Sequence, residues 1–256
     1  MKKNIFLIIL TLVTVFCIIV GASRHLGLPR KSFSSVSSSI RKGLRHGRLS
    51  FHFNKYDDDE DEDFDSDDTK TFDTETISEF SALDVNLKVG GLKIERGNKW
   101  QIEATYPNSY LKPEYNLKDG KLTISQPDYR NKKLTNKGCS VVITVPFGTE
   151  LDKVSIKMDV GAVEISGVDI QKGSIDTDVG AIAVSNVDFD DLDLDSDVGA
   201  VSIELVEPVE NYSINVNSDL GGIVVDGKNV KRRYSQKGSS SKQLRINTDV
   251  GGVEVK

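Results

Sequence analysis

Carboxylates at a repeated position are the residues of this sequence whose types and spacing could do chemistry. Aspartate stands two places before a small-residue pair in five segments, at Asp159, Asp178, Asp197, Asp219 and Asp249. On a strand, Asp176, Asp193 and Asp195 would point to the same face as their neighbours in this set. Carboxylate oxygens are the ligands that calcium prefers. The candidate metal ligands are therefore Asp159, Asp176, Asp178, Asp195, Asp197 and Asp219.

A second interpretation of these carboxylates needs no metal. Each aspartate can accept backbone N–H hydrogen bonds where the chain bends and otherwise face water. The spacing differs from the nonapeptide repeat of calcium-binding β-rolls, and the first copy of the pattern has Lys88 at this position. Calcium binding and solvated carboxylates therefore both stay open, and we expect no other cofactor.

Catalytic motifs are missing from the later part of the sequence. The three histidines, at 25, 46 and 52, all precede residue 71, which excludes a Ser-His-Asp or Cys-His arrangement after that point. Cys139 has no cysteine partner there, and we expect it to be a half-buried structural residue. No glycine-rich loop opens a helix as nucleotide binding requires. We expect a protein that is not an enzyme and binds no nucleic acid.

The carboxylates belong to a pattern that occurs six times. Its clearest copies are VSIKMDVGAVEI at 154–165, GSIDTDVGAIAV at 173–184 and LDLDSDVGAVSI at 192–203. The last five copies are separated by 19, 19, 22 and 30 residues. Such a period is typical of stacked units that bury their apolar faces against one another. The first glycines of the six small-residue pairs are Gly90, Gly161, Gly180, Gly199, Gly221 and Gly251.

Apolar residues alternate within each copy, and the alternation changes phase at the glycine. In Val154–Val160 the apolar residues are all at even positions, whereas Val163 and Ile165 are at odd positions. Because strand side chains alternate between two faces, the flip indicates a corner between two short strands, and glycine supplies the unusual backbone angles of such a corner. We therefore predict a mainly β fold, a single-stranded β-solenoid with coils of 19 to 22 residues.

One inward position of the predicted solenoid is polar. Hydroxyl side chains of equal height can hydrogen-bond along a stack, which makes a small buried polar group tolerable. We expect these residues to be structural rather than catalytic. They lie three places before the glycine and are Thr177, Ser196, Ser218 and Thr248.

Residues 1–22 are predicted to be a membrane anchor or an uncleaved signal. Ile5–Ala22 is an uncharged apolar run, about 27 Å long as a helix, close to the hydrocarbon thickness of a bilayer. A cleaved signal peptide is the alternative, because Val20-Gly21-Ala22 resembles a cleavage site. The domain after the run is expected on the extracytoplasmic side of the membrane, but basic residues directly after the run favour a cytoplasmic orientation, which stays open.

Residues 23–70 are predicted to be a linker, basic at first and then acidic. Ser23–Phe53 combines apolar residues at helical spacing with Arg41, Lys42, Arg45 and Arg48, so it is either a membrane-surface helix or a disordered stalk. The acidic block Asp57–Asp68 is expected to be solvated.

Residues 71–256 are the predicted solenoid, irregular at 71–150 and regular at 151–256. Strands are expected at Gln101–Tyr106, Lys121–Ser125 and Ser140–Val145 in the irregular part. The loop Asp226–Gln243 is expected to project and move. The last copy ends at Lys256 without an obvious cap, which predicts an open strand edge for docking.

Taken together, the glycine-corner repeats, the Ile102–Ile124 strand region and Val141–Leu151 leading into Val154–Gly161 resemble the bacterial putative-adhesin family of β-strand-repeat domains of unknown function. The likeness covers residues 77–256 and implies a β-solenoid on membrane-anchored or envelope-associated bacterial proteins, with no catalytic residue. We therefore predict a single-pass plasma-membrane protein that is a non-catalytic binding or scaffold module with a protein or glycan partner. The alternatives are a regulatory component of envelope-stress sensing and a calcium-binding or glycan-acting β-helix.

Overall fold

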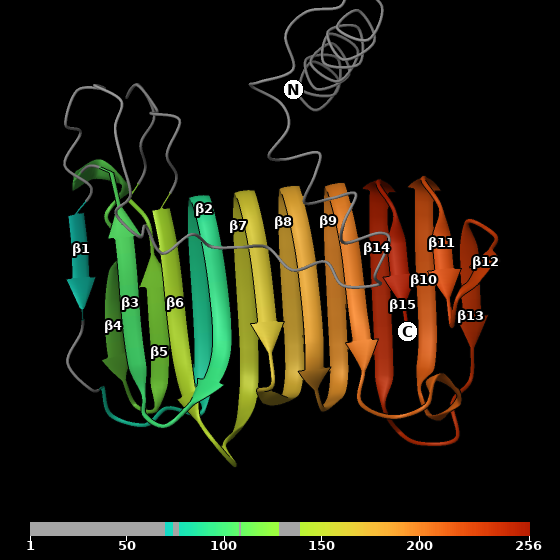
Figure 1. The fold of residues 1–256 in the computed structure, drawn as a ribbon, viewed down its shortest axis with the longest axis horizontal. Coiled ribbons are helices and arrows are strands. Elements are labelled where there is room, and N and C mark those ends of the chain that lie inside the picture. Colours follow the sequence, from blue (N-terminus) through green and yellow to red (C-terminus); the bar gives the residue numbers. More distant parts are fainter. Residues whose placement is uncertain (1–69, 74–76, 108, 128–138) are drawn as a thin grey trace, which may run out of the picture. The chain divides into compact units, whose positions relative to one another are not determined.

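The computed structural model describes residues 70–73, 77–107, 109–127 and 139–256, which form one sheet of 15 strands folded into stacked coils (Figure 1). Mainly β structure and a solenoid-like repeat were predicted, and both are confirmed. The predicted anchor, and the linker up to residue 69, lie outside the described residues. In the described part of the chain, no helix has the length and apolar content needed to cross a bilayer.

Four long parallel strands form the regular middle of the stack. Each one runs through its Gly-Gly or Gly-Ala pair without a break, so the predicted corner is a bend within one strand and not a gap between two. Equal repeat positions pair across the coils, as Ile156 does with Ile175 and Ile175 with Leu194. In stacking order these strands are β2 (Ala82–Gly97), β7 (Glu150–Ser166), β8 (Asp169–Val187) and β9 (Phe189–Leu205).

The core is a set of apolar ladders that run along the stack. In β7 every second residue from Val154 to Met158 is buried, and after the corner the buried residues Val163 and Ile165 have the opposite parity, as the phase change predicted. Each ladder residue therefore packs against its counterparts in the coils on either side, and parallel strands buried in this way need their apolar residues in register. One ladder after the corner is Val163, Ile182, Val201, Val253 and Ile223.

At the N-terminal end, the first coil is assembled from separate strands. The first half of β2 pairs with β5 and its second half pairs with β6. Between the residues of β2 that pair with β5 and those that pair with β6, the side chain of Gln126 takes the place of a strand. Its oxygen accepts hydrogen bonds from the backbone N–H groups of Lys88 (2.7 Å) and Val89 (2.9 Å). The strands here are β1 (Lys70–Asp73), β3 (Gln101–Tyr106), β4 (Glu114–Lys118), β5 (Lys121–Ser125) and β6 (Cys139–Pro146), with a 3₁₀ turn at Ser109–Leu111.

At the C-terminal end, the coils do not stack in the order of the sequence. The last copy, β14 (Gln243–Val250) and β15 (Val253–Val255), lies inside the stack and pairs with β9. The copy before it, β10 (Ser213–Leu220) and β11 (Ile223–Val225), lies outside β14 and β15. The predicted open edge at the C-terminus is therefore wrong.

The segment predicted to be a projecting loop covers the end of the stack. It contains β12 (Lys228–Val230), which pairs antiparallel with β11, and β13 (Arg233–Gln236), which pairs antiparallel with β10. These pairings satisfy the outer edges of β10 and β11 and leave their inner edges for β14 and β15. A 3₁₀ turn at Val209–Asn211 precedes β10.

Candidate functional site

The six glycines predicted to mark the corner do line up along one axis, in the order 90, 161, 180, 199, 251 and 221. A Cβ atom on Gly180 would lie 1.7 Å from the carbonyl oxygen of Gly161, and one on Gly251 would lie 1.5 Å from that of Gly199. No side chain fits at such distances. The corner therefore requires glycine because the backbones of neighbouring coils touch there.

The backbone angles at the corner are a smaller part of the reason than the sequence predicted. Among the six glycines, only Gly90 (φ +149°) and Gly161 (φ +154°) have the positive φ that disfavours other residues. The four later corner glycines have ordinary φ values, yet a Cβ atom would collide at each of them. Close stacking, and not unusual backbone angles, is the requirement that all six share.

The inward hydroxyls lie beneath these glycines and are almost fully buried. The Ser218 hydroxyl donates a hydrogen bond to the Gly251 carbonyl oxygen at 3.2 Å. The hydroxyls of Thr177, Ser196 and Thr248 have no hydrogen-bond partner within the described part of the chain. The predicted chain of hydrogen bonds from hydroxyl to hydroxyl is therefore wrong, and these side chains fill the narrow space under the corner.

The aspartates two places before the glycine form one straight row on the outside of the stack. We call them the carboxylate row; in stacking order they are Asp159, Asp178, Asp197, Asp249 and Asp219. Only Asp159 has a cationic partner in the described residues, Lys88, whose Nζ lies 3.2 Å from Oδ2. The other four have no hydrogen bond there, so the predicted backbone N–H bonds at the corner are absent from the described residues.

A second line of side chains, two residues earlier in each strand, lies beside the carboxylate row. Lys157 forms an ion pair with Asp176 (3.5 Å), at the same end of the stack as Lys88. In the next coil, Asp195 lies in register with Asp176 on one side and Asn247 on the other. Within these two lines the lysines lie near one end, and the middle and the far end have carboxylates and amides.

Burial and mutual repulsion raise the pKa values of three of these carboxyl groups. For Asp178 the largest cause of the raised pKa is desolvation, followed by the charge of Asp159. For Asp197 desolvation comes first again, followed by the charges of Asp249 and Asp178. The pKa of Asp195 is raised by desolvation and by Asp176. A face on which carboxylates repel one another attracts cationic groups.

The geometry of this face differs from that of a protein metal site. In the described residues, no three His, Cys, Asp or Glu side chains are grouped so that they could hold one ion. The carboxylates of the row succeed one another along the stack, about 4.8 Å apart, instead of converging on a point. Calcium binding remains a prediction. Calorimetry on the full-length protein in millimolar calcium tests it directly: the absence of both a binding heat and a shift in the unfolding midpoint would contradict calcium binding.

An exposed apolar column, which strand parity did not predict, lies beside the carboxylate row. The parity of Val160 placed it with the core, but it is 45% exposed, because the bend turns this side chain outward. Leu220 is 60% exposed at the equivalent position. The signal was present, since every corner glycine follows Val or Leu. We call this column the apolar ridge; in stacking order it is Val89, Val160, Val179, Val198, Val250 and Leu220.

The single cysteine in the described residues lies in the core. Cys139 is 2% exposed, so it is fully buried and not half-buried as predicted. Desolvation raises the pKa of its thiol to about 12, although a hydrogen bond with Gln126 acts in the opposite direction. A thiol held in its protonated form has little nucleophilic reactivity at neutral pH.

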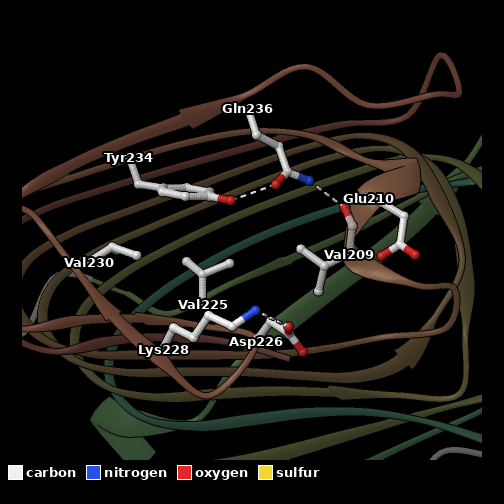
Figure 2. Close-up of a pocket in the computed structure, with 8 residues that line it drawn as sticks. All are labelled: Val209, Glu210, Val225, Asp226, Lys228, Val230, Tyr234 and Gln236. Atoms are coloured by element: carbon white, nitrogen blue, oxygen red, sulfur yellow. Dashed lines mark hydrogen bonds and ion pairs between the residues drawn. The ribbon is translucent and has the colours of Figure 1, made fainter.

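A small pocket of about 180 Å³ lies under the end cover of the stack (Figure 2). Val209, Val225 and Val230 form much of its wall. The Tyr234 hydroxyl donates to Gln236 Oε1 at 2.5 Å, and the Gln236 amide donates to the Val209 carbonyl oxygen at 2.6 Å (Figure 2). The pocket is smaller than most ligand sites, and these polar groups already bond to one another, so they are poorly placed to orient a ligand.

Comparisons with known proteins agree with this architecture. The sequence model of the family described as Toastrack DUF4097 matches residues 80–231. A solved structure described as a putative cell adhesion protein from Clostridium sporogenes is 19% identical, with a TM-score of 0.61, and the match covers 73% of this chain and 99% of that one. At this identity the likeness shows a shared fold.

A second solved structure, described as a putative adhesin from Bacteroides fragilis, is 16% identical with a TM-score of 0.35, and the match covers 73% of this chain and 97% of that one. No curated protein matches the chain.

Proposed function

Because the chain belongs to the Toastrack DUF4097 family, we propose that it is a non-catalytic, adhesin-like binding module of the bacterial cell envelope, anchored to the plasma membrane by Ile5–Ala22. The Clostridium sporogenes protein, which shares the fold over 99% of its length, is described as a putative cell adhesion protein, and this supports the adhesin-like part of the proposal. The apolar run supports the anchor. The partner is a protein or a glycan of the envelope.

The observation that carries this proposal is that chemically similar side chains, acidic in one line and apolar in another, align along one face of the stack. The carboxylate row and the apolar ridge each repeat in register over five or more coils. Side chains held by a continuous hydrogen-bonded sheet lose little freedom when a partner binds, which lowers the cost of association. The face is therefore suited to binding an extended partner.

The residues that could do chemistry support a non-catalytic role. All three histidines precede residue 71, and Cys139 is buried with a raised pKa. The hydroxyls of Thr177 and Ser196 have no hydrogen-bond partner in the described residues, and both side chains are 0% exposed. None of these groups meets the requirements of a nucleophile or a general base.

Photocrosslinking of the full-length protein in bacterial envelope preparations tests this function. We compare the wild type with Val179→Ser on the apolar ridge and with a matched control, Val206→Ser, which changes an exposed valine away from the corner. We expect one ligand to crosslink to the wild type and the control but not to Val179→Ser. Equal crosslinking by all three proteins, or turnover of the captured ligand, would contradict the proposal.

The anchor and the orientation have a separate test. Intact cells are treated with a protease, and fragments of residues 71–256 are followed by immunoblotting. An extracytoplasmic domain is degraded in intact cells, whereas a cytoplasmic one is degraded only after lysis. Release of the whole protein into the medium would contradict anchoring by Ile5–Ala22.

A regulatory role in envelope-stress sensing is the second candidate, favoured by the basic segment Ser23–Phe53. Its apolar residues at helical spacing, with cationic residues alongside them, suit an anionic membrane surface. Tight, salt-sensitive binding of this segment to anionic vesicles favours regulation, and absence of binding favours a plain binding module.

A further inference from the structure

The apolar ridge accounts for much of the exposed apolar surface of the described residues. Seven large hydrophobic side chains are exposed among the described residues. Four of the seven lie on the ridge: Val160, Val179, Val250 and Leu220. Val89 and Val198 are half-buried at the same repeat position. Single exposed apolar residues need no explanation, but a continuous line of them marks an interaction surface.

The length and spacing of the ridge suit an α-helix that lies along the stack. Six residues in neighbouring coils span about 24 Å at about 4.8 Å per coil. A helix of about 16 residues has the same length and presents one apolar group in each turn of about 5.4 Å. An extended strand matches less well, because side chains on one of its faces are about 6.6 Å apart.

The two flanks of the ridge differ, and the difference specifies the partner. On one side the carboxylate row follows the ridge residue by residue, with Lys88 as its cationic neighbour at one end only. On the other side, after the corner glycine, each coil has alanine or glycine, as at Ala162, Ala181 and Ala200. Small residues let a partner backbone approach, and unpaired carboxylates favour lysine or arginine along one flank.

Other occupants fit this surface less well. A second copy would bring carboxylate rows close together, and like charges at such distances repel. An anionic membrane surface is disfavoured for the same reason. A glycan is usually held against aromatic faces, and the six ridge residues are all Val or Leu. A basic amphipathic helix satisfies the apolar column and the carboxylates together.

We propose that the apolar ridge and the carboxylate row together form a docking surface for a basic amphipathic helix of a partner protein. The inference rests on the proposed binding function and adds the chemical class of the partner. The apolar face of the helix packs on Val160, Val179, Val198 and Val250, and its cations face Asp178, Asp197 and Asp249.

A designed peptide tests this surface without knowledge of the natural partner. The probe is a fluorescent helix of about 18 residues, composed of Leu, Ala and Lys, with Leu at helical spacing and Lys along one flank. The full-length protein is held in phosphatidylcholine nanodiscs, and the signal from empty nanodiscs is subtracted. We expect a dissociation constant of about 10 to 100 µM at low salt, and at least tenfold weaker binding of a scrambled peptide with the same composition.

Three variants locate the binding. The double substitution Val179→Ser and Val198→Ser is expected to weaken binding at least tenfold, and Val206→Ser is expected to leave it unchanged. The pair Asp178→Asn and Asp197→Asn is expected to weaken binding about tenfold and to reduce its salt dependence. Because all of these side chains are at least partly exposed, the variants are expected to fold.

The proposal is overturned if the designed and scrambled peptides bind equally, or if the double valine variant binds like Val206→Ser. Failure of the peptide alongside ridge-dependent crosslinking of an envelope ligand would reject the helical partner and leave the proposed function standing. Ligand crosslinking that ignores the ridge would reject the proposed function itself.

Discussion

The middle and the C-terminal end of the stack are built from the same repeat but assembled differently. In the middle, β2, β7, β8 and β9 lie next to one another in sequence order (Figure 1). At the C-terminal end, β14 is inserted between β9 and β10, although β10 precedes it in the chain. The repeat therefore determines the shape of a coil, whereas the choice of neighbour depends on residues outside the repeat.

Lys242, the residue just before β14, holds the inserted coil through contacts with residues from earlier segments. Lys242 is 15% exposed, pairs with Asp188, and has its Nζ 2.5 Å from Glu207 Oε1. Its ammonium group also lies 5.6 Å from the centre of the Tyr212 ring. Burial lowers the pKa of Lys242, but its hydrogen bonds to Asp188 and Glu207 outweigh burial and raise it. Opposite charges meet at this end, whereas like charges line the corner face of the middle.

Deletion of Gln243–Lys256 is expected to destabilise the C-terminal end far more than the middle of the stack, and this is the largest expected effect. It removes β14 and β15, which are the inner neighbours of β10 and β11. We expect amides of β10 to β13 to lose their protection in hydrogen exchange, whereas those of β7 and β8 keep it. A stack in sequence order would lose only its outermost coil, so continued protection of β10 would contradict the observed order.

Glycine-to-alanine substitutions at the corner are expected to be nearly as severe in both regions. Gly180→Ala places a Cβ atom 1.7 Å from the Gly161 carbonyl oxygen, and Gly251→Ala places one 1.5 Å from that of Gly199. We expect each to lower the free energy of unfolding by about 3 kcal/mol or more, measured by urea denaturation. Gly222→Ala is the matched control, since no atom lies within 4 Å of its added Cβ. Similar stability of all three variants would contradict close backbone stacking.

Lys242→Met is expected to weaken the C-terminal end without removing its packing. Methionine keeps most of the aliphatic side chain but loses the ion pairs with Asp188 and Glu207. We expect the midpoint of thermal unfolding to fall by about 5 °C. Lys228→Met is the control: the Lys228 side chain is 78% exposed and pairs with an exposed Asp226, so a change of less than about 1 °C is expected. Equal shifts would show that the Lys242 contacts do not hold the inserted coil.

Asp197→Asn is expected to have the smallest effect and the opposite sign. The raised pKa of Asp197 means that the folded protein holds this proton at a pH where the unfolded chain has released it. The free energy of unfolding therefore falls as the pH rises from the pKa of Asp197 in the unfolded chain to its pKa in the folded protein. Above the folded-state pKa, the ionised carboxylate destabilises the folded protein. We expect Asn to raise the unfolding midpoint at pH 7 by about 1 to 2 °C and to make no difference at pH 3.

A matched substitution in the same row tests the cause of this effect. Asp159→Asn breaks the ion pair with Lys88, so it is expected to lower the unfolding midpoint slightly at pH 7. If both Asp159→Asn and Asp197→Asn lower the midpoint at pH 7, repulsion within the carboxylate row is not the cause.

Local patterns predicted the strands well because neighbouring residues determine them. β3 and β5 have the predicted bounds, Gln101–Tyr106 and Lys121–Ser125, since alternation and nearby turn residues are both local signals. The alignment of the corner glycines was also predicted, because equal sequences in stacked coils must reach the corner at the same height. The carboxylate row followed from the same alignment.

The apolar ridge and the buried hydroxyls show where local patterns are insufficient. Parity assigned Val160 to the core, but the strand bends there and the side chain is exposed. The hydroxyl column was predicted from its spacing, but hydrogen bonds between Thr177 and its neighbours depend on the rotamers that packing leaves available, and packing leaves Thr177 without a partner in the described residues.

The sequence by itself determined the coil: its length, its bend, its buried ladders and the acidic row beside the bend. Only the tertiary structure decided which coil lies on which, because each copy offers the same backbone hydrogen bonds and the same apolar face to either neighbour. That choice was made by β12 and β13, which cover the outer edges of β11 and β10, and by Lys242, which holds the entry to β14. The Lys242 contacts join residues far apart in the chain, whereas β12 pairs with β11 across a short turn, and no repeat period encodes either contact.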